Sequence, residues 1–233
     1  MADAELTMSL GEDYPEIREQ VRKLCEEFPG EYWRNLENQP PSGSYPTEFI
    51  EALTAAGYLA ALIPEEYGGA GLPMRGGAAI LETINTTGCS ASPGHAQMYT
   101  MGTILRHGSK EQKAHFLPKI ASGELRLQAF GVTEPSTGSD TTQLKTRADK
   151  QGNGYVINGQ KVWTTSAHHA NWGLLLARTD WDAPKHTGLS YFIIDIEQEG
   201  VTVQPLKQMN GHASFNQVFF TDAIVEPEMQ VSE

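Results

Sequence analysis

Two neighbouring stretches decide the fold of the second half of the chain: FGVTEPSTGSD at residues 130–140 and NGQKVWTT at residues 158–165. In the first, apolar strand-like residues run into a turn made of Pro, Ser, Thr, Gly and Asp. In the second, Asn158-Gly159 predicts a tight type I′ hairpin turn, and a strand with one Trp and two Thr follows. We expect the two stretches to face one ligand that has a large flat ring and a charged tail.

Short runs rich in Val, Ile, Leu, Phe and Trp continue around these stretches, separated by turns and without a helical pattern between them. They predict strands at residues 127–133, 145–149, 155–158, 160–165, 172–179, 189–194, 201–204 and 218–220. This spacing indicates an antiparallel barrel or sandwich and not a parallel α/β sheet.

The first half of the chain instead has the three- and four-residue periodicity of helices. Predicted helices lie at residues 14–28, 46–56, 74–86, 93–106 and 109–121. Ser109 and Gln112 form a capping box at the start of the last one. The change of pattern near Leu125 predicts an α+β fold with an N-terminal all-helical domain at residues 1–125. An antiparallel β-barrel-like domain follows at residues 126–233.

Composition and charge exclude several classes of protein. The chain has 233 residues, of which 39% are hydrophobic, and this is enough for a real hydrophobic core. Its net charge of −12 argues against a nucleic-acid partner, which needs a basic face. Cys25 and Cys89 have no spacing typical of disulfides or zinc sites, which indicates a reducing compartment. The start of the chain, with Asp3, Glu5 and Glu12, is acidic and has no apolar core. We therefore expect no signal peptide and no membrane span, and a cytoplasmic location, or the mitochondrial matrix if the source is eukaryotic.

Other candidate sites in the sequence are weak. The glycines at residues 68–71 resemble a dinucleotide loop, but Met74 occupies the position of the third glycine. No pair of histidines has a metal-ligand spacing supported by carboxylates, so we expect no metal. We interpret His168-His169 as a solvated turn. Met98 and Met101 fit core packing better than a flexible pocket lining.

Each part of the two opening stretches also has a plain structural interpretation when taken alone. Residues 136–140 fit a surface turn, Trp163 a core residue, and Glu134 a hydrogen-bonded structural group. Their combination is more specific, because residues 127–180 closely resemble the middle domain of the acyl-CoA dehydrogenase family. The matching motifs are FGVTEP at 130–135, GSD at 138–140, YVINGQKVWTT at 155–165 and ANW at 170–172. Similar motifs extend outward, namely IPEEYGG at 63–69, GSKEQK at 108–113 and NQVFF at 216–220.

This resemblance implies FAD as the cofactor. The cofactor-binding residues that it implies are Phe130, Val132, Thr133, Gly138, Ser139, Trp163 and Thr165. Val132 and Thr133 would meet the edge of the flavin ring, and Trp163 would pack against the ring. The chain departs from the family at Phe130, where many members carry Tyr and its hydroxyl.

The resemblance further implies roles for the polar residues. Gly138 and Ser139 would lie at the FAD pyrophosphate, with Ser139 also near the CoA ester of the substrate. Thr165 would hydrogen-bond near the flavin nitrogen that accepts a hydride. The helix at residues 93–106 would line the acyl end. His95 is its candidate substrate contact, although a plain surface histidine is the favoured interpretation.

The implied reaction is FAD-dependent α,β-dehydrogenation of an acyl-CoA thioester to the 2-enoyl-CoA. The implied partners are the acyl-CoA substrate and an electron-transferring flavoprotein, with a homotetramer or homodimer as the full-length form. Family members carry the catalytic Glu in a third, helical domain, whose positions fall beyond Glu233. We therefore assign no catalytic residue here and expect this chain, as the N-terminal two thirds of such an enzyme, to be inactive alone. A flavin-dependent oxidase or monooxygenase of the same fold, and a non-catalytic short subunit that needs a partner chain, remain alternatives.

Overall fold

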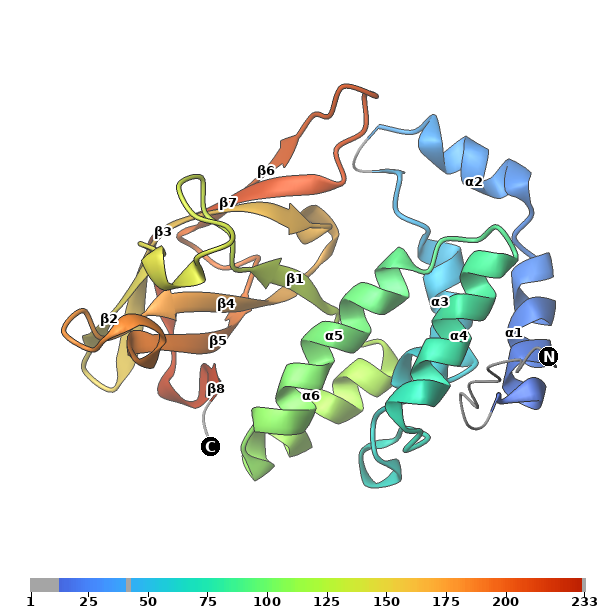
Figure 1. Cartoon of the computed structure of the whole chain (residues 1–233), viewed down its shortest axis with the longest axis horizontal. Coiled ribbons are helices and arrows are strands. Elements are labelled where there is room, and N and C mark those ends of the chain that lie inside the picture. The colour runs from blue at the N-terminus through green and yellow to red at the C-terminus, as the bar shows by residue number, and fades with distance from the viewer. Residues whose placement is uncertain (1–12, 41–42, 232–233) are drawn as a thin grey trace, which may run out of the picture.

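The computed structural model describes residues 13–40 and 43–231. A helical half and a sheet half lie side by side, with α5 and α6 nearest the sheet and α1 farthest from it (Figure 1). This confirms the predicted α+β fold with helices first and strands second. The acidic start of the chain lies outside the described ranges. No helix within them is long and apolar enough to cross a membrane.

Six α-helices form the first half of the described chain. They are α1 (Pro15–Glu26), α2 (Gly30–Glu37), α3 (Thr47–Ala55), α4 (Met74–Thr86), α5 (Ser92–His107) and α6 (Lys110–Ser122). The periodic apolar stripes predicted five of these. The sixth helix, α2, was not predicted, because Pro29-Gly30 directly after residue 28 is typical of a helix end. Pro29 is in fact the N-cap of α2, and Tyr32 and Trp33 of this helix are partly buried against the helical core.

The predicted capping box at the start of α6 is confirmed. The Gln112 amide N–H donates to Ser109 Oγ at 3.1 Å, and the Ser109 amide N–H donates to Gln112 Oε1 at 3.0 Å. Gln112 Nε2 also donates to the carbonyls of Glu228 and Gln230, at 2.7 and 2.9 Å. One side chain therefore caps a helix and ties it to the far end of the described chain.

In the described part of the chain, eight strands form one sheet in the order β6-β7-β3-β2-β4-β5-β8, and β1 pairs with β4. The strands are β1 (Leu127–Gly131), β2 (Arg147–Gln151), β3 (Gly154–Thr165), β4 (Trp172–Arg178), β5 (Leu189–Asp195), β6 (Val201–Leu206), β7 (Phe215–Val225) and β8 (Gln230–Val231). The sheet is not closed into a barrel. It is also mixed, because β1 and β2 both pair in parallel with β4. The long connection from β1 to β4 provides the crossover that parallel pairing requires, so the antiparallel, barrel-like prediction needs this correction.

The predicted hairpin at Asn158-Gly159 is wrong, because β3 runs through both residues without a turn. The hairpin that joins β2 to β3 lies earlier in the chain, at residues 151–154. The pairing of β3 with β7 shifts register between Ile157 and Gly159, and Asn158 hydrogen-bonds there with Asp222 of β7. Gly159 is needed because its φ is 151° and an added Cβ would come within 2.5 Å of Thr146 Oγ1. The Asn-Gly signal therefore marks a bulge against a neighbouring backbone.

Three clusters of buried apolar side chains hold the structure together. One lies within the sheet half and one among α1, α3 and α4. The third crosses between the halves and joins Met101, Phe116 and Ile120 to Leu174 and Ile193. Each fully buried side chain of this size contributes about 1.5–3 kcal/mol. The third cluster therefore holds α5 and α6 firmly against β1, β4 and β5, and the division at residue 125 stays a prediction.

Candidate functional site

The candidate site begins where β1 ends and the chain enters the polar loop at residues 132–140, here called the 132–140 loop. Glu134 and Thr137 close a tight turn, in which each amide N–H donates to the carbonyl of the other residue, at 2.9 and 3.1 Å. The Thr137 hydroxyl donates to the Asp140 carbonyl at 2.5 Å. Gly138 and Ser139 are exposed at the tip. The loop is therefore ordered by its own bonds while its tip stays open.

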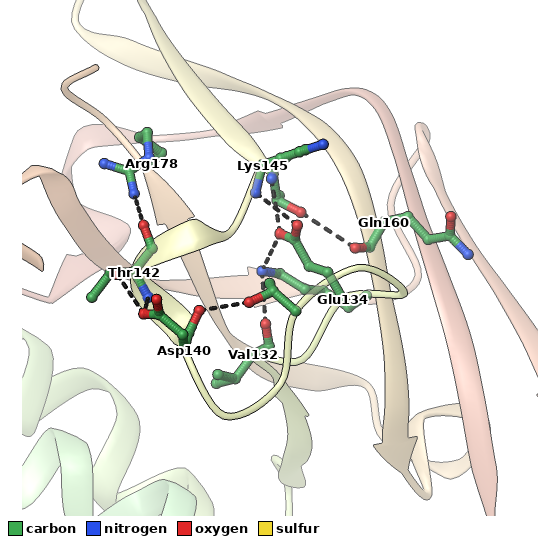
Figure 2. A network of polar contacts seen from close by, with 10 residues as sticks. Val132, Glu134, Asp140, Thr142, Lys145, Gln160 and Arg178 are labelled. Carbon is green, nitrogen blue, oxygen red and sulfur yellow. Dashed lines mark hydrogen bonds and ion pairs between the residues drawn. The ribbon is translucent and has the colours of Figure 1, made fainter. Parts of the chain in front are cut away.

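A buried ion pair lies behind this loop. Lys161 of β3 and Glu134 are 0% and 4% exposed, and Lys161 Nζ lies 2.9 Å from Glu134 Oε1. Lys161 Nζ also donates to the Val132 carbonyl at 3.0 Å. The two carboxylate oxygens accept from the amides of Lys145 and Thr146, at 2.7 and 2.8 Å. Figure 2 shows the Glu134 carboxylate pointing toward the Lys145 backbone, with the Val132 carbonyl on the other side of the network.

These contacts determine the ionisation of the pair. Burial by itself would raise the pKa of Glu134, but hydrogen bonds from Lys161, from the Lys145 amide and from Thr146 outweigh it, so the pKa lies below its ordinary value. Burial lowers the pKa of Lys161, and Glu134 offsets part of that effect. Glu134 is therefore a carboxylate at neutral pH. The prediction that it is a hydrogen-bonded structural group is confirmed.

Trp163 lies next to this pair along β3 and is strained and exposed. The pairing of β3 with β7 shifts register between Lys161 and Thr164, and Trp163 has a φ of 61°, in the left-handed region. Its side chain is 57% exposed and meets Phe215 edge-on at 5.8 Å. The core interpretation of Trp163 is therefore wrong. A left-handed φ is rare for a bulky residue and tends to occur at functional sites.

The two sequence stretches meet through the backbone. The Val162 amide N–H donates to the Thr133 carbonyl at 2.8 Å, directly after the contact between Lys161 and Val132. The structure thus brings Val132 and Thr133 beside the strand that carries Trp163 and Thr165. Whether they contact a flavin stays a prediction.

Thr165 ends β3 at a cavity of about 530 Å³ between the sheet and the segment that precedes α3. His168 and His169 follow on a 3₁₀ turn and line the same cavity. The His169 ring lies 4.8 Å from that of Tyr45 and 3.9 Å from that of His168. Both histidines lie on a turn, as predicted, but they are half-buried and not fully solvated. This burial depends on tertiary contacts that the local sequence does not show. Tyr45 is far away in the sequence, and its hydroxyl donates a hydrogen bond to Gln128 Oε1 at 2.8 Å.

His95 is exposed on α5. It lines a groove of about 500 Å³ between α4 and α5, whose walls include Met74, Leu81 and Met98. The His95 ring lies 5.2 Å from Tyr99, and Tyr99 lies 5.3 Å from Phe130. A chain of rings therefore connects the groove to the end of β1. Phe130 faces this chain, and its ring also stacks with Tyr191 at 6.2 Å.

Lys161 belongs to the YVINGQKVWTT motif, but no role was predicted for it from the sequence. The available signal was its place in the alternation of β3, where a charged residue occupies an inward position. Within the described ranges, no group of three or more His, Cys, Asp or Glu side chains could hold a metal ion. The site is thus an open polar loop beside an exposed indole, fixed from behind by a buried ion pair.

Comparison with known proteins shows the family of this chain. The family model for the acyl-CoA dehydrogenase N-terminal domain matches residues 11–124, and the model for the middle domain matches residues 129–223. The chain therefore belongs to the acyl-CoA dehydrogenase family, as the sequence motifs predicted.

Individual relatives agree with this assignment. The chain is 36% identical over 228 residues to the acyl-CoA dehydrogenase IpdE1 of Mycobacterium tuberculosis, covering 94% of this chain and 59% of that protein. The crystal structure of an acyl-CoA dehydrogenase from Geobacillus kaustophilus superposes with a TM-score of 0.86 at 28% identity, covering 97% of this chain and 60% of that one. The crystal structure of the ChsE4-ChsE5 complex of Mycobacterium tuberculosis superposes with a TM-score of 0.81 at 30% identity, covering 94% of this chain and 56% of that one. The chain thus spans about three fifths of these relatives.

Proposed function

We propose that this chain forms the flavin wall of an FAD-dependent acyl-CoA dehydrogenase, which converts an acyl-CoA thioester to the 2-enoyl-CoA. The observation that carries the proposal is Trp163, which a bulge in β3 holds exposed at a left-handed φ. A left-handed φ at Trp163 costs free energy, and the indole that it exposes to water is large and apolar. Both features are readily explained if a flat ring packs against the indole.

The residues around Trp163 fit FAD. Within the described ranges, no protein group bonds to the hydroxyls of Thr133, Ser139 or Thr165, so all three can serve a ligand. At the tip of the 132–140 loop, an added Cβ on Gly138 would meet only Thr133 Cγ2, at 3.8 Å. The backbone there is open to a pyrophosphate, whose oxygens suit exposed N–H groups.

Each residue has a specific role in this proposal. FAD, when bound, supplies the acceptor for the hydride that leaves the β-carbon of the acyl chain. Phe130 and Val132 would border the ring, and the hydroxyls of Thr133 and Thr165 would donate hydrogen bonds to its polar edge. Hydrogen-bond donors held in this way stabilise negative charge that develops on the ring without having to reorganise.

The groove between α4 and α5 is the proposed acyl site. Its lining combines apolar side chains, among them Leu81 and Met98, with the polar side chain of Arg106. The chain of rings from His95 through Tyr99 to Phe130 leads from the groove to the flavin wall. Ser139 would contact the CoA ester from the loop side. His95 is exposed on the groove wall and is assigned to the rim, where it can contact a polar group of the substrate.

The base that removes the α-proton is assigned to a part of the protein beyond Glu233. Glu134 does not serve as this base. It is the only buried carboxylate in the described ranges, and its oxygens are occupied by Lys161 and by two backbone amides. Electrons would leave to an electron-transferring flavoprotein. The full protein would be a homotetramer or homodimer, with a heteromeric assembly as the alternative that the ChsE4-ChsE5 complex supports.

The test uses the purified protein and added FAD. We expect quenching of flavin fluorescence on binding and, in the natural full-length protein, acyl-CoA-dependent reduction of a dye acceptor. Absence of FAD binding by the full-length protein would refute the proposal. Turnover that consumes oxygen without a dye would instead establish the oxidase or monooxygenase alternative.

A further inference from the structure

The ion pair between Lys161 and Glu134 takes no part in the proposed chemistry. Within the described ranges, however, each side-chain hydrogen bond from this pair to another residue ends on the main chain at one side or the other of the 132–140 loop. Lys161 Nζ binds the Val132 carbonyl at 3.0 Å. Glu134 binds the amides of Lys145 and Thr146 at 2.7 and 2.8 Å. The pair therefore joins the start of the 132–140 loop to the segment that follows it.

We propose that Lys161 and Glu134 are positioning residues for the flavin, because they lock the 132–140 loop in the one conformation that presents Val132 and Thr133 to the ring. This inference rests on the proposed function and deepens it. Neither residue contacts the cofactor itself. They act through the Val132 carbonyl and through the backbone on both sides of the loop.

Stability alone does not explain such a pair. Removing two charges from water is expensive, and apolar residues of similar volume often hold a core equally well or better. What a buried pair adds is geometric definition, because each partner must keep its hydrogen bonds or leave a charge unsatisfied. Here the bonds fix main-chain atoms on the two sides of an otherwise exposed tip.

The register of β3 links this lock to the indole. Lys161 points inward to Glu134, the Val162 amide binds the Thr133 carbonyl at 2.8 Å, and Trp163 is exposed at the bulge. Three successive residues therefore hold the loop and present the aromatic wall. A change at Lys161 moves the polar edge of the site relative to Trp163.

The first test measures amide hydrogen exchange in Lys161→Met and in the matched control Lys145→Met. Both changes remove one lysine charge, but the side chain of Lys145 is exposed and its backbone N–H is kept. We expect faster exchange at Thr146 and at Glu134 in Lys161→Met, relative to amides of β5, and no local change in the control. Unchanged exchange in Lys161→Met would overturn the inference whether or not FAD binds.

The second test separates positioning from stability. The double variant Glu134→Gln with Lys161→Met leaves no unpaired buried charge, so its thermal midpoint should recover toward that of the unaltered protein. Its FAD affinity should stay about tenfold lower, because Met offers no donor to the Val132 carbonyl. The visible absorption band of bound FAD should also shift, because its polar edge loses a fixed neighbour. Recovery of both midpoint and FAD affinity would overturn the inference.

The two tests also separate this inference from the proposed function. If the unaltered protein binds no FAD, the proposed function fails, and the exchange rates alone decide whether the pair locks the loop. If the single variant does not fold, the double variant provides both measurements. Normal FAD affinity in a folded double variant counts against positioning in either case.

Discussion

Replacing Trp163 by glycine should separate the stability of this protein from its affinity for flavin. At a φ of 61° a non-glycine residue costs about 1–2 kcal/mol, which glycine relieves. The same change removes an edge-on contact with Phe215 at 5.8 Å, worth about 0.5–1.5 kcal/mol. The two effects nearly cancel. The free energy of unfolding should therefore change by no more than about 1 kcal/mol, and the thermal midpoint by about 2–4 °C.

The affinity for FAD should fall much further. Stacking of a flat heteroaromatic ring on an aromatic side chain contributes about 1–3 kcal/mol. Its loss corresponds to an increase in Kd of about 5- to 150-fold. Titration of FAD against the purified protein, followed by flavin fluorescence, measures this change, and a thermal melt of the same sample measures stability.

The matched control is Trp181→Gly. Trp181 is also 57% exposed, but its φ is not left-handed and its ring lies 5.4 Å from the Arg178 guanidinium. Glycine there relieves no strain and loses a cation–π contact of about 0.5–1 kcal/mol. Stability should fall slightly, and FAD affinity should not change. Equal FAD affinity in Trp163→Gly and the unaltered protein would refute the assignment of Trp163 as the ring wall.

Three further predictions concern stability and reactivity. Gly159→Ala should destabilise the protein by about 1–3 kcal/mol in urea unfolding, because the added Cβ comes within 2.6 Å of Thr146 Cα. In the control Gly152→Ala the added Cβ meets no atom within 4 Å, so the only loss of stability comes from placing alanine at a left-handed φ. The folded-state pKa of Glu134 is lowered, so ionisation of this carboxyl stabilises the folded protein. That stabilisation is complete above the unfolded pKa of about 4.3 and is lost as pH falls through the folded pKa. Unfolding measured across this acid range should show a smaller pH dependence in Glu134→Gln, and identical slopes would contradict the pKa assignment. Burial raises the pKa of the Cys25 thiol to about 11, so iodoacetamide should alkylate it only after unfolding, and rapid labelling of native protein would contradict its burial.

The sequence by itself determined the order of helices and strands, because hydrophobic periodicity is a local property. Both ends of the helix Met74–Thr86 were predicted correctly from its apolar stripe. The capping box was predicted from Ser109 and Gln112, which are three positions apart. The family also followed from the sequence, since its motifs are contiguous. Local patterns failed where a neighbour far along the chain decided the outcome. Asn158-Gly159 is typical of a hairpin, but its pairing with β7 and the close approach of Thr146 make it a bulge.

The tertiary structure alone decided how the candidate site is held. No sequence pattern around Trp163 predicts the register shift between β3 and β7. This shift places the backbone of Trp163 at a left-handed φ and leaves its indole exposed. Nothing local to Lys161 predicts that its amine meets Glu134 and the Val132 carbonyl in the core. Glu134 and Lys161 are 27 positions apart in the sequence, and their bond exists only because β3 passes behind the end of β1. Pairing of this kind depends on strand register, which is a property of the whole sheet.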